Sequence, residues 1–223
     1  PGVSFESLLE EMTDRAMLAR YPDPGYVCAQ SSSYDRASTS PAEGKSWFAN
    51  NDYNHFLRSE EVHGRTEWVM LDQPGPGAVV RIWSANPKGV MRVYLDGKAE
   101  PVIDAPMAEL LGGKPSLVGP PLAHEAARGF NLYLPIPYAK HCKVTSDRDG
   151  FYYHVNYRTY EPGTEVLSVS ADGLAGSSEV LAATNETLRV GVAVPNPVAA
   201  ERDLPSGGEF VATLPPGSHA VTE

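Results

Sequence analysis

Long apolar runs, basic clusters and cysteine-rich motifs are missing from this sequence, and each absence argues against a class of protein. No stretch approaches the roughly 20 consecutive apolar residues that a membrane span requires, so no span is predicted. The 18 Lys and Arg residues form no run and the net charge is −10, which argues against a nucleic-acid partner. The two cysteines, Cys28 and Cys142, are predicted to be buried free thiols. The compartment stays open, with the periplasm or secretion slightly favoured over the cytoplasm.

The common catalytic signatures are missing as well. The sequence has no glycine-rich loop of the kind that cradles phosphate and no nucleophile elbow. The six histidines are scattered and no spacing of His and Cys fits a zinc site, so neither a metal nor another cofactor is predicted. The residues alone therefore select no reaction.

What the sequence does contain favours an all-β fold. Twenty prolines and twenty glycines separate short runs rich in Val, Tyr and Thr, which is typical of a β-sandwich or jelly roll. Helical spacing of apolar residues appears over Ser4–Arg20, where Ser4 offers an N-cap. We therefore expect an N-terminal helical arm over residues 1–25 and a jelly-roll domain over residues 26–223. The helix is expected to cover a sheet edge or dock on a neighbouring subunit.

Residues 75–97 predict a β-hairpin that turns at Asn86–Gly89, where proline and glycine supply the turn geometry. One face of its two arms is apolar and consists of Val80, Ile82, Met91, Val93 and Leu95. The other face carries planar cations and aromatic rings, which can stack on or clamp a partner: Arg81, Trp83, Arg92 and Tyr94.

A second hairpin is predicted from Lys140 to Tyr160, with its turn at Arg148–Gly150. Its last strand alternates in the same way, with a core face of Phe151, Tyr153, Val155 and Tyr157. The opposite face consists of Tyr152, His154, Asn156, Arg158 and Tyr160. If these strands are sheet neighbours, their polar and aromatic residues form one surface, suited to carbohydrate or to a second sheet or subunit.

A long polar loop is predicted from Ser31 to Asn54. Loops of this length are uncommon in compact domains unless they bind something or move. Five of its residues could read the hydroxyls and the ring of a sugar: Asp35, Arg36, Trp47, Asn51 and Asp52. Alternatively, Asp35 and Arg36 form a local pair, Asn50–Asp52 makes Asx turns and Trp47 fills the core.

Glu60, Glu61 and Glu67 are the carboxylates to consider as an acid/base pair. Arg58 and Arg65 lie close in sequence, so we favour ordinary surface charges. Further strands are predicted at Glu165–Ser170, Val180–Ala182, Leu188–Pro195 and Glu209–Leu214.

Five ordered motifs between about Tyr26 and Ser170 resemble glycoside hydrolase family 172. They are Ser33–Arg36, Trp47–Asp52, Gly75–Trp83, Leu132–Tyr138 and Asn156–Tyr160. The resemblance implies the first jelly roll of a double jelly roll. It also implies assembly as trimers or multiples of trimers, with a site for furanosides near subunit contacts.

Under this resemblance the chain would be one component of a retaining hydrolase of fructofuranosides or D-arabinofuranosides. The catalytic glutamates would lie in a second jelly roll, either beyond this chain or on a second chain. The substrate-binding residues would be Asp35, Arg36, Trp47, Asn51, Asp52, Arg81, Trp83, Asn156 and Arg158. The alternative is a non-catalytic carbohydrate-binding or structural assembly protein with the same capsid-like fold.

Overall fold

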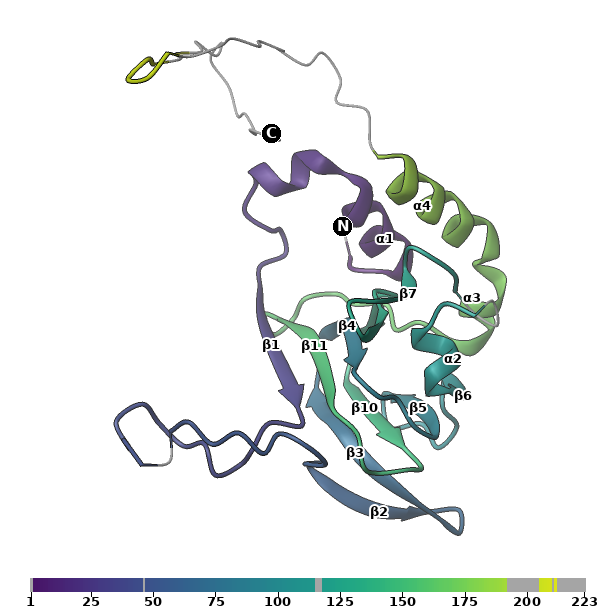
Figure 1. Ribbon diagram of the computed structural model, residues 1–223. Coiled ribbons are helices and arrows are strands. Elements are labelled where there is room, and N and C mark those ends of the chain that lie inside the picture. The colour runs from purple at the N-terminus through teal and green to yellow at the C-terminus, as the bar shows by residue number, and fades with distance from the viewer. Residues whose placement is uncertain (1, 46, 115–117, 192–204, 210, 212–223) are drawn as a thin grey trace.

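The computed structural model describes residues 2–45, 47–114, 118–191, 205–209 and 211. It shows a β-sandwich of two antiparallel sheets flanked by short helices (Figure 1). The six-stranded sheet has the order β1-β11-β4-β8-β7, with β9 also paired to β4. Its strands are β1 (Tyr26–Ser32), β4 (Gly77–Ser84), β7 (Ala123–Ala126), β8 (Gly129–Leu132), β9 (Ile136–Tyr138) and β11 (Tyr153–Tyr160).

The five-stranded sheet has the order β2-β3-β10-β5-β6. Its strands are β2 (Arg58–Val62), β3 (Arg65–Pro74), β5 (Val90–Leu95), β6 (Ile103–Pro106) and β10 (His141–Ser146). A short helix, α2 (Met107–Leu111), follows β6 and buries Met107, Leu110 and Leu111. The predicted all-β sandwich with a short N-terminal helix is confirmed.

The core lies between the inner faces of the two sheets. As predicted from alternation, it contains Met91, Val93 and Leu95 of β5, together with Phe151, Tyr153 and Val155 at and before β11. On β4 the core residues are Val79 and Ile82, and Val80 is only partly buried. The register of β4 against β11 shifts between Asn156 and Tyr157, and this bulge turns Val79 inward in place of the predicted Val80.

The two hairpin predictions are wrong. β4 and β5 belong to different sheets, and so do β10 and β11, so each connection crosses the sandwich. Both arms of a sheet-to-sheet connection bury one face against the same core, as the arms of a hairpin do. Alternation therefore predicts the inner face correctly in either arrangement, but it does not say which strand pairs with which.

The N-terminal helix begins at the predicted cap. In α1 (Phe5–Thr13), the Ser4 and Ser7 side chains exchange hydrogen bonds with each other's backbone N–H groups. Phe5 and Leu9 belong to the main core. The helix predicted to run to Arg20 is interrupted at Asp14, whose side chain caps a separate 3₁₀ helix, η1 (Arg15–Ala19).

Near the C-terminus, helices replace two of the predicted strands. Residues 171–190 form α3 (Ala171–Gly176) and α4 (Ser178–Val190), so the strand at Val180–Ala182 and the start of the one at Leu188–Pro195 are wrong. The reason is that Leu181, Thr184 and Leu188 repeat at helical spacing and pack inward. Of Glu165–Ser170, only Val166 forms a bridge, to Val3. Most of Glu209–Leu214 lies outside the described residues.

Residues 33–57, here called the arm, form the predicted long loop. The arm contains turns but no helix or strand in its described part, and Figure 1 shows it extending away from the sandwich beside β1. None of the described helices is long and apolar enough to cross a bilayer.

Candidate functional site

A row of hydrogen-bonding side chains crosses the outer face of the six-stranded sheet. The Gln30 Oε1 atom accepts a hydrogen bond from Asn156 Nδ2 at 3.0 Å. The Arg81 guanidinium donates to Asn156 Oδ1 at 3.4 Å and to Asn131 Oδ1 at 3.0 Å. The row thus spans β1, β11, β4 and β8. We call these four residues, together with Trp83 and His154, the polar-aromatic face.

Trp83 and His154 lie side by side next to this row. Their ring centroids are 4.7 Å apart. Burial and the nearby Arg81 cation lower the pKa of His154, against the opposing effect of the Asp52 carboxylate, so the ring is neutral at pH 7. The face thus offers a neutral imidazole, an indole and a partly buried guanidinium.

Gly129 positions Trp83 through a close backbone approach. A Cβ atom at Gly129 would lie 2.2 Å from Trp83 Nε1, so a side chain there would push the indole away. We therefore expect Gly129→Ala to cost about 1–3 kcal/mol of stability, as overpacking does, and to shift the tryptophan fluorescence. Urea unfolding measures the cost, and Gly119→Ala is the matched control because a Cβ there meets no atom within 4 Å. Equal stability of the two variants would show that Trp83 does not rest on Gly129.

The arm is held in shape by two of its own carboxylates. Asp35 Oδ1 accepts from the Ala37 N–H at 2.9 Å, and Asp35 Oδ2 accepts from the Asn51 N–H at 3.0 Å. These bonds lower the pKa of Asp35. Asp52 Oδ1 accepts from the Asp35 N–H at 2.8 Å. Asp35 and Asp52 therefore fix the loop, and the Asp52 carboxylate lies near enough to His154 to act on its pKa.

Arg36 and Trp47 do not adopt the structural roles considered as the alternative to sugar binding, which were an ion pair with Asp35 and a place in the core. The Arg36 guanidinium donates to the carbonyl oxygens of Ser32 and Tyr34, both at 2.8 Å, and stacks over the Tyr34 ring, so it does not pair with Asp35. Trp47 is 48% exposed and lies against Phe48, so it does not fill the core.

Arg158 lies apart from the other predicted binding residues. At the far end of β11, its guanidinium makes two hydrogen bonds to the Glu11 carboxylate, at 2.7 and 2.8 Å, and stacks on Tyr26. It lines a cleft between α1 and the start of β1. Arg81, Trp83 and Asn156 are thus brought together, whereas Arg158 fastens the N-terminal helix to the sheet.

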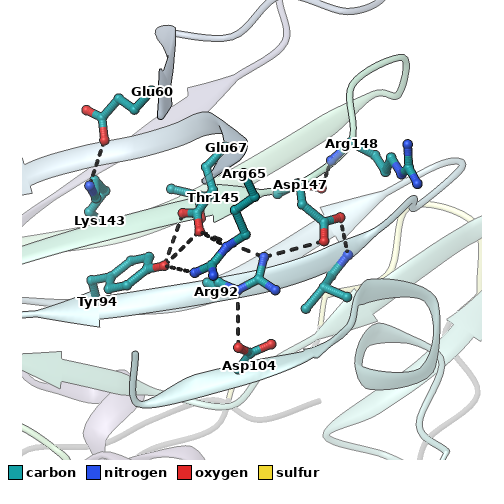
Figure 2. Close-up of polar contacts among 12 residues, drawn as sticks. Glu60, Arg65, Glu67, Arg92, Tyr94, Asp104, Lys143, Thr145, Asp147 and Arg148 are labelled. Carbon is teal, nitrogen blue, oxygen red and sulfur yellow. Dashed lines mark hydrogen bonds and ion pairs between the residues drawn. The ribbon is translucent and has the colours of Figure 1, made fainter. Parts of the chain in front are cut away.

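Arg92 and Tyr94 are on the opposite side of the molecule, so the single surface expected from the two hairpins does not form. They belong to β5, and their side chains lie on the outer face of the five-stranded sheet. There they surround Glu67, as Figure 2 shows. The correction follows from the topology: β4 and β5 present their outer faces in opposite directions.

Glu67 is not a surface charge, contrary to the sequence prediction, because its side chain is 0% exposed. It accepts hydrogen bonds from Thr145 at 2.7 Å, from Tyr94 at 2.8 Å and from Arg65 at 2.8 Å. Burial alone would raise the pKa of Glu67, but these donors outweigh it and hold the pKa below its usual value. A carboxylate held ionised in this way is a structural anion and a poor proton donor.

The other two candidate glutamates are also engaged. Glu60 pairs with Lys143 at 2.7 Å and with Arg58, and these bonds lower its pKa. Glu61 accepts a hydrogen bond from the Thr66 hydroxyl at 2.6 Å. Neither faces the polar-aromatic face, because β2 is an edge strand of the other sheet.

In the part of the chain that the structure describes, no group of three or more His, Cys, Asp or Glu side chains is arranged to hold a metal ion. Cys142 is a buried free thiol as predicted, and burial raises its pKa. Cys28 is free but exposed, so that half of the prediction is wrong. The reason is that β1 is an edge strand whose outer face is uncovered.

Jelly-roll sandwiches of two sheets occur in lectins as well as in viral capsid proteins. The family model described as the GH172 first beta-sandwich domain matches residues 24–176. The chain therefore belongs to glycoside hydrolase family 172, and it contains the first β-sandwich domain of that family. The search of curated proteins finds no match to the chain.

Sequence reasoning missed two members of the polar-aromatic face, Gln30 and Asn131. Gln30 stands just before the loop predicted from Ser31, and Asn131 lies in β8 between the partly buried Phe130 and the buried Leu132. Asn131 could have been predicted from the sequence, because it is an amide at a strand position between two apolar residues. Nothing local marks Gln30, since its place in the row depends on the pairing of β1 with β11.

Proposed function

We propose that this chain supplies the substrate-binding face of a furanoside hydrolase, at a site completed by a neighbouring domain or subunit. The observation that carries the proposal is the row from Gln30 to Asn131, in which amides and one guanidinium lie beside the Trp83 ring. Membership of a glycoside hydrolase family supports carbohydrate as the ligand.

The chemistry of the polar-aromatic face suits a small sugar. Amide groups both donate and accept hydrogen bonds, as sugar hydroxyls do, and a guanidinium adds a fixed fork of donors. An indole offers an apolar surface to the C–H side of a sugar ring. Arg81 and Trp83 are two positions apart on β4 and share its outer face, so one sugar ring can contact both side chains.

The need for a neighbour follows from the carboxylates. A retaining hydrolase uses two carboxyl groups about 5–5.5 Å apart, one of them able to carry a proton. Asp35 and Asp52, two carboxylates of the arm, accept hydrogen bonds from backbone N–H groups of the arm itself. The catalytic pair is therefore assigned to a separate domain or subunit, and the arm, with its exposed Trp47, to the contact with it.

The experiment is hydrolysis of aryl glycosides by the purified protein, including every chain that copurifies with it. The expected result is turnover of an α-D-fructofuranoside or a D-arabinofuranoside and no turnover of the matching pyranosides. Turnover of pyranosides alone, or of no substrate in the panel, would contradict the proposal.

A non-catalytic carbohydrate-binding role is the second candidate, and the commitment of Asp35 and Asp52 to the arm favours it for the isolated chain. Calorimetry separates the two. Furanoside binding without turnover in the complete assembly would support the second candidate, whereas turnover in the assembly supports the first.

A further inference from the structure

The free edge of β1 differs from the edges at the other ends of the two sheets. β1 reads YVCAQSS over seven residues, with no charge and no proline. The strands β7, β2 and β6 are shorter and carry the devices that usually block edge pairing: Glu125 in β7, Arg58, Glu60 and Glu61 in β2, and Asp104 and Pro106 in β6. Only β1 among these edges is long and unprotected, within the described chain.

The backbone groups that β1 turns outward can be identified from its hydrogen bonds. The Ser33 N–H donates to the Tyr153 carbonyl of β11, so odd-numbered residues of β1 bond inward. Tyr26, Cys28 and Gln30 therefore turn their N–H and C=O groups away from the sheet. Ser32 does so too, but its carbonyl already accepts from Arg36.

Exposed apolar side chains are frequent on β1 and on the segments that precede and follow it in the chain. Val27 is 69% exposed on β1, Tyr21 before it is 98% exposed, and Phe48 after it is 75% exposed. Most large apolar or aromatic side chains that are exposed in the described part lie between residues 21 and 57: Tyr21, Val27, Tyr34, Trp47, Phe48, Tyr53 and Leu57. Such a concentration is typical of an interaction surface.

We propose that β1 pairs with β1 of a second copy of this chain, antiparallel across a twofold axis at Cys28. In this register Cys28 faces the partner's Cys28, and Tyr26 faces the partner's Gln30. The pairing uses the three outward residues with free backbone groups and ends where Arg36 covers Ser32. The six-stranded sheets of two protomers become one continuous sheet.

A second copy fits this edge for two reasons. An uncharged strand brings no like charges together when it meets itself. The antiparallel arrangement places the exposed Tyr21 end of one protomer near the arm of the other, so the apolar groups at both ends gain cover.

The exposed thiol provides a direct test of the register. Residues that face each other in a hydrogen-bonded antiparallel pair have Cα atoms about 5.5 Å apart, within the range that a disulfide spans. Mild oxidation of the purified protein should therefore link two chains through Cys28, and Cys28→Ser should abolish the link. An oxidised protein that stays a single chain while it is oligomeric would overturn the proposed register.

Charge substitutions test the contact itself. Cys28→Lys and Cys28→Glu each place like charges opposite each other and should weaken this association at least tenfold in sedimentation velocity. Mixing the two variants should restore a heterodimer, which a folding defect in either variant would not allow. A wild-type protein with no twofold contact, or variants that associate as the wild type does, would overturn the proposal. Hydrolase activity plays no part in these measurements, so the proposed function stands or falls separately.

Discussion

Replacing Arg81 with methionine is expected to lower kcat/KM for the best furanoside substrate by about 10- to 100-fold. Methionine keeps much of the side-chain bulk but removes the charged donors, and a hydrogen bond from a charged group contributes about 1.5–3 kcal/mol. The Asn131 and Asn156 amides that Arg81 now orients would also lose their fixed partner. Steady-state kinetics of the complete assembly measures the effect.

The matched control is Arg189→Met. Arg189 lies on α4 with its side chain 67% exposed and pairs only with Glu186 among the described contacts, so the same substitution there should leave kcat/KM unchanged. Equal activity of the Arg81 and Arg189 variants would remove Arg81 from the binding face.

Loss of the Glu67 carboxylate should be the most destabilising polar substitution on the five-stranded sheet. Glu67→Ala leaves Arg65, Tyr94 and Thr145 without their shared acceptor in a buried site. Removing one partner of a buried ion pair costs about 3–5 kcal/mol, and we expect about 3 kcal/mol because Arg65 can reach water. Chemical denaturation measures this, with Glu61→Ala as a surface control expected to cost about 0.5 kcal/mol.

The same carboxylate makes stability depend on pH. The pKa of Glu67 is lower in the folded than in the unfolded chain, so its contribution is complete above the unfolded value of about 4.3 and is lost as pH falls through the folded value. Glu67→Gln should therefore show a weaker loss of stability below about pH 4.3 than the wild type. Parallel pH profiles for the two proteins would contradict the assignment of Glu67 as a buried anion.

The faces of the strands were predictable because alternation is a local property. Arg81 and Trp83 point outward and Met91 and Val93 point inward, as the sequence indicated. The pairing of strands was not predictable, because the turns after β4 and β10 serve equally as hairpin turns or as crossings between sheets. This ambiguity is why Arg92 and Tyr94 were wrongly predicted to lie on one surface with Arg81 and Trp83.

The candidate site was predictable in part for the same reason. Arg81, Trp83 and Asn156 meet because β4 and β11 are neighbours, which alternation allowed but did not require. Arg158 does not join the polar-aromatic face because it pairs with Glu11, which lies on a helix far from it in sequence. The sequence did not predict α4 because its short apolar clusters, taken locally, fit a strand as well as a helix; the helical repeat of Leu181, Thr184 and Leu188 extends over more than two turns.

The most direct test of the account is to find where the sugar binds. A photoreactive furanoside, crosslinked to the complete assembly and mapped by peptide mass spectrometry, should label the segments around Arg81–Trp83 and His154–Asn156, with competition by the unlabelled sugar. Labelling confined to the outer face of the other sheet, around Glu67, Arg92 and Lys143, would contradict it.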